Sequence, residues 1–130
     1  MFLTLTSDLK TFSKFENSVA WSFSNLEFQS GDRIGLKEIG LKFSKPQINA
    51  HTSVSCNLVE KNLYNMNGLI YTAIFKRDRD IRQVYSSPSY WPIDVIRPRD
   101  IELTFSNVNT SHIDFISITI EIQNEQNRTL

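Results

Sequence analysis

Apolar and polar residues alternate with a period of two over most of this chain, and no other feature of the sequence constrains its fold as strongly. The clearest run is residues 113–122, in which isoleucines alternate with Thr119, Glu121 and other polar residues. Successive side chains of a β-strand point to opposite faces, so this run predicts a strand with one buried face. One slip in the alternation, at residues 115–116, is typical of a β-bulge.

Similar alternation recurs between turn-forming residues along the rest of the chain. Alanine occurs only three times, whereas β-branched and aromatic residues fill nearly every alternating segment, which favours strands over helices. The sequence allows one helical turn, over residues 9–15, with Ser7 and Asp8 as caps. Gly35 and Gly40 indicate a bulge or a close approach to the backbone. Besides 113–122, the predicted strands cover residues 1–8, 19–28, 34–43, 54–58, 69–75, 81–85, 91–95 and 101–105.

These strands predict an all-β fold with one core between two packed sheets. A chain of 130 residues has about the length of one domain, and no repeat or shift in composition marks a second one. About eight to nine short strands favour a two-sheet β-sandwich with jelly-roll-like topology, and an immunoglobulin-like strand order is the alternative. We expect residues 1–130 to form this single domain, with 1–15 as an N-terminal strand or arm and 123–130 as a flexible C-terminal tail.

Charge, cysteine content and targeting signals exclude several classes of protein. The 14 lysines and arginines balance 14 aspartates and glutamates, so nothing drives strong attraction to nucleic acid or anionic lipid. The single cysteine, Cys56, excludes an intrachain disulfide and favours a reducing interior. The first residues do not form a signal peptide, so we expect no classical secretion. No run approaches the roughly 18 apolar residues of a membrane-spanning helix, so we expect no membrane span.

No set of side chains in the sequence assembles a recognisable catalytic or metal site. Cys56 shares the strand parity of Val54 and Leu58, which places its thiol in the core, where a free cysteine behaves as a small apolar group. The alternative is a nucleophilic thiol paired with His51 or His112. Two histidines about sixty residues apart and one cysteine do not complete a zinc shell. We therefore expect a protein that is not an enzyme and that has no cofactor or metal site.

Aromatic and basic residues between positions 77 and 91 are the candidate contacts for a ligand or partner. Tyr85, Tyr90 and Trp91 bracket a Ser/Pro loop, and such rings stack on sugars or anchor protein interfaces. The competing interpretation is that Trp91 plugs one end of the sandwich. Arg77 and Arg79 alternate with aspartates in a predicted solvated hairpin end, and they are also candidate partner contacts. Because the aspartates cancel most of the basic field, we expect no nucleic-acid binding.

Several segments resemble, in order, the strand motifs of one family. Residues 30–39 (SGDRIGLKEI) resemble a G-D-W-E-V-A-L-x-E-I motif, with Arg33 in place of the aromatic residue. Residues 54–60 (VSCNLVE) resemble V-Y-C-D-L-V-E, and residues 99–103 and 116–122 resemble looser strand motifs. These motifs occur in β-rich proteins encoded by Polinton/Maverick-type elements and their adintovirus relatives, large DNA transposons with virus-like capsid genes. This chain is shorter than those proteins.

The resemblance implies a structural component of a virion or virus-like particle, without catalysis. We therefore expect a protein of a virus or virus-derived element that acts through its surface by self-association, as a capsid accessory or fibre-head-like module. We expect a homo-oligomer, with a trimer favoured, in the virion or the host-cell interior. Other virion proteins or a host-surface ligand are further expected partners. The alternative function is a carbohydrate- or peptide-binding β-sandwich that uses the aromatic loop of Tyr85, Tyr90 and Trp91.

Overall fold

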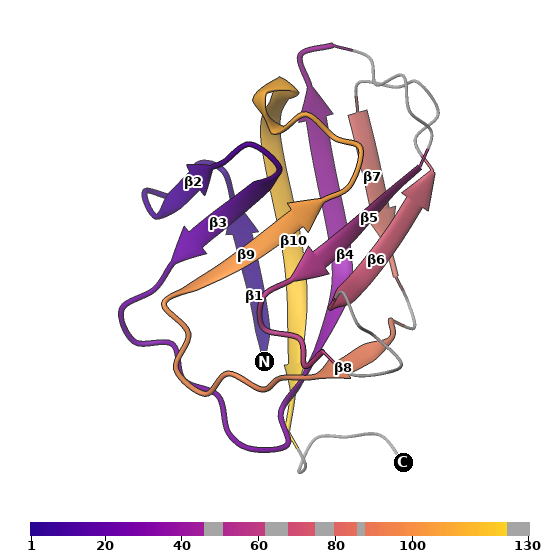
Figure 1. Cartoon of the computed structure of the whole chain (residues 1–130). Coiled ribbons are helices and arrows are strands. Elements are labelled where there is room, and N and C mark those ends of the chain that lie inside the picture. Colours follow the sequence, from indigo (N-terminus) through magenta and orange to yellow (C-terminus); the bar gives the residue numbers. More distant parts are fainter. Residues whose placement is uncertain (46–50, 62–67, 75–79, 86–87, 125–130) are drawn as a thin grey trace.

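The computed structural model of the chain describes residues 1–45, 51–61, 68–74, 80–85 and 88–124. Its strands form two antiparallel sheets, here called A and B, that face each other (Figure 1). A single turn of 3₁₀ helix, η1 (Thr110–His112), precedes the last strand. Sheet A consists of β1 (Phe2–Thr6), β10 (Ile113–Gln123), β4 (Arg33–Phe43) and β7 (Asp80–Val84), in that order, with β8 (Tyr90–Pro92) also paired to β4. Sheet B consists, in order, of β2 (Phe12–Lys14), β3 (Ser18–Ser22), β9 (Asp100–Phe105), β5 (His51–Cys56) and β6 (Leu69–Ile74).

The strands pair in a nested order. β1 pairs with β10, β3 with β9, β4 with β7 and β5 with β6, so the first half of the chain runs antiparallel to the second half. The chain is thus one long two-stranded ribbon that is rolled into two sheets, which is the strand order of a jelly roll. This order confirms the predicted all-β sandwich with jelly-roll-like topology. The described residues contain ten strands, and β2 is the one that the alternation did not predict.

Side chains from the inner faces of the two sheets form one continuous core, as the alternation predicted. Trp21 and Ile101 of sheet B and Ile39 and Ile118 of sheet A are each 0% exposed. Burial of each such side chain stabilises the fold by about 1.5–3 kcal/mol. The core therefore uses the apolar half of the alternating pattern.

Two β-bulges in the β10–β4 ladder keep apolar residues on the inner face. In β10 the register shifts between Ile113 and Phe115, which makes Asp114 the extra residue. Ile113 and Ile116 are both buried as a result, although odd and even positions of a regular strand point to opposite faces. The slip predicted at residues 115–116 therefore lies at Asp114. In β4 the extra residue is Lys37, because Thr119 pairs with Glu38 whereas the next residue of β10 pairs with Leu36.

Residues 23–32 connect β3 to β4 and cross one end of the sandwich (Figure 1). The alternation predicted a strand as far as Phe28, but β3 ends at Ser22. Phe28 is 2% exposed and its backbone nitrogen donates to the carbonyl of Ile96 at 2.7 Å. Its apolar character therefore reflects burial at the end of the core rather than a place in a sheet. Gly31 lies in the turn before β4 at a φ of 90°, a conformation that favours glycine.

A short strand replaces the helical turn that the sequence allowed over residues 9–15. β2 forms there because the ring of Phe12 packs on Trp21, with 5.3 Å between the ring centroids. In addition, Nζ of Lys14 donates to the carbonyl of Ile113 at 2.9 Å. Contacts with residues distant in the sequence thus override the local capping signal.

Trp21 also ties sheet B to sheet A, because its Nε1 donates to the carbonyl of Thr6 in β1 at 2.8 Å. We predict that Trp21→Phe lowers the free energy of unfolding by about 2–4 kcal/mol, since it leaves a void and removes a donor from Thr6. Ser22→Ala, at the exposed neighbouring position, is the control and should change it by no more than about 0.5 kcal/mol. Urea denaturation followed by circular dichroism measures both. Equal effects of the two substitutions would contradict the packing described here.

Candidate functional site

The cysteine lies in the core. Cys56 ends β5, is 2% exposed and belongs to the same buried cluster as Val54 and Leu58, as its strand parity predicted. Burial, with smaller contributions from Asp100 and Glu102, raises the pKa of its thiol from 9.0 to about 12. A thiol in such surroundings stays protonated at neutral pH, and the protonated form is not a nucleophile. The position of Cys56 is that of a small apolar core residue.

The backbone places the two histidines apart from this cysteine. β5 begins at His51 and ends at Cys56, so about 16 Å of extended strand separates their backbones. His112 lies in η1, at the upper end of the molecule in Figure 1, where its carbonyl accepts from the nitrogen of Ser44. Within the described part of the chain, no three His, Cys, Asp or Glu side chains gather as a metal site requires. The same residues hold no helix with the length and apolar character needed to cross a bilayer.

The three aromatic candidates do not share one surface. Tyr85 and Trp91 are half-buried and pack against the core. Tyr90 precedes Trp91 in β8, so its side chain points to the opposite, outer face of sheet A. Trp91 therefore packs against the core, and its role as a plug at one end of the sandwich stays a prediction. Arg77 and Arg79 lie outside the described residues.

Tyr90 lies across three strands on the outer face of sheet A. It is opposite Gly35 of β4, and Gly35 is opposite Glu121 of β10. The Oη of Tyr90 donates to Oε2 of Glu121. A Cβ atom on Gly35 would lie 2.6 Å from Cε1 of Tyr90, so the ring covers this glycine. The glycine predicted a close approach, but nothing local in the sequence identified Tyr90 and Glu121 as the residues that make it. Partial burial and the hydrogen bond to Glu121 raise the pKa of Tyr90 to about 12.

A hollow of about 310 Å³ lies beside Gly40 on the same outer face. Phe115 and Ser117 of β10 line one side of it. Arg82 and Glu38 line the other side, where Nε of Arg82 lies 2.8 Å from Oε1 of Glu38. Lys42 also lines the hollow, so the hollow presents an apolar ring, the Arg82–Glu38 ion pair and one further basic side chain.

Two apolar side chains stand exposed on strands that flank this face. Phe2 of β1 is 61% exposed and Val84 of β7 is 63% exposed. Phe2 lies opposite Glu121, and Val84 lies opposite Glu38, which places both on the outer face. Single exposed apolar residues are ordinary on protein surfaces, but two on the same face as an apolar hollow favour a contact surface.

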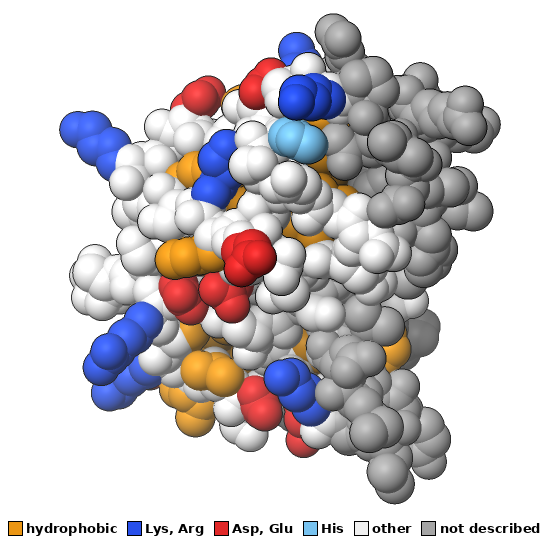
Figure 2. All heavy atoms as spheres, turned by 45° about the horizontal axis from the view of Figure 1, so that its top comes forward, with side chains coloured by type: hydrophobic (Ala, Val, Ile, Leu, Met, Phe, Trp, Pro, Cys, Tyr) orange, Lys and Arg blue, Asp and Glu red, His pale blue; other side chains and the backbone are white. Residues whose placement is uncertain are grey.

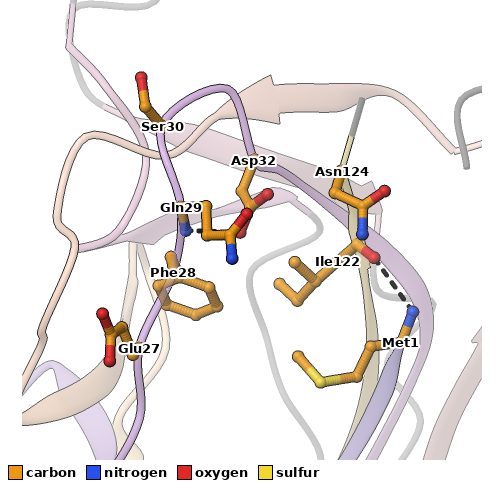
Figure 3. Close-up of a pocket in the computed structure, with 8 residues that line it drawn as sticks. All are labelled: Met1, Glu27, Phe28, Gln29, Ser30, Asp32, Ile122 and Asn124. Carbon is orange, nitrogen blue, oxygen red and sulfur yellow. Dashed lines mark hydrogen bonds between the residues drawn. The ribbon is translucent and has the colours of Figure 1, made fainter. Parts of the chain in front are cut away.

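A second hollow, a pocket of about 410 Å³, lies where residues 27–32 approach the ends of β1 and β10 (Figure 3). Phe28, Ile122 and Met1 form its apolar side. Asp32 is 7% exposed, and its Oδ2 accepts from the backbone nitrogen of Gln29 at 2.8 Å. This buried carboxylate therefore stabilises the turn that leads into β4, which is a structural role.

Acidic and basic side chains are interspersed over the face shown in Figure 2. Such an arrangement creates no extended field of one sign on the described part of that face. No family model, curated protein or solved structure matches the chain. The resemblance to proteins of Polinton/Maverick-type elements and adintoviruses therefore stays a prediction from strand motifs.

We predict that native Cys56 reacts with a thiol reagent at pH 8 at least about 100-fold more slowly than the unfolded chain, because burial raises its pKa and excludes the reagent. Ser13→Cys provides an exposed thiol on β2 as the control, and it should react in the native state. Absorbance of the released thiolate measures both rates. A native Cys56 as reactive as Ser13→Cys would restore the nucleophile hypothesis.

We predict that Gly35→Ala lowers the free energy of unfolding by about 1–3 kcal/mol, because the added methyl group collides with the ring of Tyr90. In a Tyr90→Ala background, Gly35→Ala should lower the free energy of unfolding by less than about half of its effect in the wild type, because the ring is absent. Tyr90→Phe keeps the ring and loses the hydrogen bond to Glu121, so the cost there should stay at its wild-type value. Equal costs in all three backgrounds, measured by urea denaturation, would contradict the contact.

Proposed function

We propose that this chain is a non-enzymatic structural module of a virus or virus-derived element that acts through its surface by self-association. The observation that carries the proposal is the outer face of sheet A, which exposes Phe2 and Val84 and holds the hollow at Phe115. Covering these side chains with a second copy removes apolar surface from water, and symmetric association covers the same surface on every copy.

The strand order supports the same proposal. Jelly rolls build viral capsid and lectin domains, which work by packing or binding. The segments that resemble proteins of Polinton/Maverick-type elements coincide with parts of β4, β5, β9 and β10, two strands from each sheet. Because one fold serves many functions, the surface carries the proposal and the fold only supports it.

In this proposal the module is a capsid accessory or fibre-head-like part, located in the virion or the host-cell interior. It forms a closed homo-oligomer, of which the expected trimer is one form, and other virion proteins or a host-surface ligand are further partners. The buried thiol of Cys56 supports a role without covalent chemistry. The carbohydrate- or peptide-binding alternative has less support, because Tyr85 and Trp91 pack against the core while Tyr90 lies on the outer face.

We predict that the mass in solution rises above the 15.1 kDa of one chain as concentration increases. Sedimentation equilibrium between about 1 µM and 1 mM covers the range expected for a small interface. Phe2→Lys or Val84→Lys should weaken association about tenfold or more, because a contact would bury an unpaired charge. Thr11→Lys, at an exposed position beside sheet B, is the control and should leave association unchanged. The mass of one chain at every concentration would overturn the proposal.

A further inference from the structure

The first strand of sheet A is paired on one side. β1 is the end strand of its sheet, and β10 is its neighbour among the described residues. Met1 and Ile122 exchange two hydrogen bonds at one end of this ladder, at 3.1 and 2.8 Å. At the other end, the nitrogen of Ser7 donates to the carbonyl of Ile116 at 2.9 Å. Antiparallel residues alternate between hydrogen-bonded and non-hydrogen-bonded pairs, so the odd-numbered residues of β1 face β10.

The backbone N–H and C=O groups of Phe2, Thr4 and Thr6 consequently point away from the sheet. The side chains agree with this assignment, because Oγ1 of Thr4 lies 3.3 Å from Oγ1 of Thr119, as in a closely spaced non-hydrogen-bonded pair. The carbonyl of Thr6 already accepts from Nε1 of Trp21. The part of the edge that is available for pairing therefore runs from Phe2 to Thr4.

The sequence at this edge does not discourage pairing. Proteins commonly protect an edge strand with lysine, proline or a bulge. β1 (FLTLT) has no charged residue and no proline, and its register with β10 has no shift. By contrast, β7 carries Arg82, β8 carries Pro92, and β2 carries Lys14. The edge strand β6 (LIYTAI) also lacks charge, so the experiments below separate the two edges.

We infer that β1 pairs antiparallel with β1 of a second copy, about a two-fold axis at Leu3. Edge-facing residues must meet one another, so even positions pair with even positions. Because the carbonyl of Thr6 is occupied, the register that uses the available groups pairs Phe2 of each copy with Thr4 of the other. This inference rests on the proposed self-association and adds a contact at the β1 edge to the contact at the outer face of sheet A. A two-fold axis gives a dimer in place of the trimer expected from the sequence.

The side chains suit this register. Leu3 is half-buried and packs against the core, and it meets Leu3 of the second copy in a non-hydrogen-bonded pair, where side chains are closest. Phe2 and Thr4 lie on the outer face, where pairing sets the exposed ring of Phe2 beside the threonine of the other copy. The pairing brings no charged side chain of β1 into contact, since the strand has none.

Amide hydrogen exchange in the full chain tests the edge directly. We expect the amides of Phe2 and Thr4 to exchange freely at about 10 µM and to become at least tenfold more protected near 1 mM. The amides of Leu3 and Leu5 face β10 and are the internal control, with protection at both concentrations. Free exchange of Phe2 and Thr4 at a concentration where the protein is a dimer would overturn the inference.

Thr4→Pro removes one edge-facing N–H and leaves the ladder to β10 intact, because proline is tolerated where the N–H side of an edge strand faces solvent. We expect dimerisation to weaken at least about tenfold with the circular dichroism spectrum unchanged, whereas Thr104→Lys, at an exposed position on the outer face of sheet B, keeps the dimer. A dimer that persists in Thr4→Pro would overturn pairing at β1 and leave self-association standing. A wild-type chain that is monomeric throughout would overturn both.

Cross-linking tests the register, and it does not depend on the folding of the proline variant. Leu3→Cys places two thiols across the axis, at the Cα separation of about 4.5 Å that a disulfide accepts. Thr4→Cys is more exposed, but its thiols lie diagonally across the pair. We expect oxidation to link Leu3→Cys into covalent dimers at least about tenfold faster than Thr4→Cys, with Cys56 buried in both. Faster linking of Thr4→Cys would overturn this register.

Discussion

Burial of the inner face of β10 is the interaction on which the rest of the structure depends. This strand lies between β1 and β4, and its isoleucines at positions 113, 116, 118, 120 and 122 are at most 4% exposed. A regular ladder of this length cannot keep all of them inward, because Ile113 and Ile116 differ in parity. The bulge at Asp114 changes the parity once on β10, and the bulge at Lys37 does so on β4. Burial of the apolar side chains offsets the ladder bonds that the two bulges disrupt.

The nested pairing that builds this core also determines where the sheets end. In a rolled ribbon the first and last strands pair with each other, so β1 pairs with β10 and is the end strand of sheet A among the described residues. The turn after β1 carries the chain directly to β2 in sheet B. An open edge at β1 is therefore a consequence of the topology. The residues along that edge then decide whether water or another strand meets its backbone groups.

Much of this architecture was predictable from local alternation, because a strand with one buried face has the same pattern whatever its neighbour is. The strands at 34–43, 101–105 and 113–122 and the burial of Cys56 follow from it. The prediction of a strand as far as Phe28 was wrong, because an apolar residue is favoured equally where a loop is buried and where a strand is buried. Ser7 and Asp8 indicated a helical turn where β2 forms, because the strand depends on packing against the distant Trp21.

The candidate site was less predictable, because it depends on which strands become neighbours. Tyr85, Tyr90 and Trp91 are close in sequence, but the strand period sends Tyr90 and Trp91 to opposite faces of sheet A. The partners of Tyr90 are Gly35 and Glu121, and the topology alone brings them together. The alternating charges at 77–80 similarly give no information about neighbouring strands.

The polar side chains that a search for chemistry would select first are already engaged in holding the fold. The carboxylate of Asp32 holds a turn, the hydroxyl of Tyr90 meets Glu121, and the indole of Trp21 reaches the carbonyl of Thr6. The bond from Trp21 links core packing to the surface of the protein, because it occupies the carbonyl of Thr6 at the edge of β1. A second copy that pairs with this edge then finds matching donors and acceptors in one register, centred on Leu3. In the proposed dimer, packing of Trp21 in the core selects this register, and a change that released the Thr6 carbonyl would open a competing register.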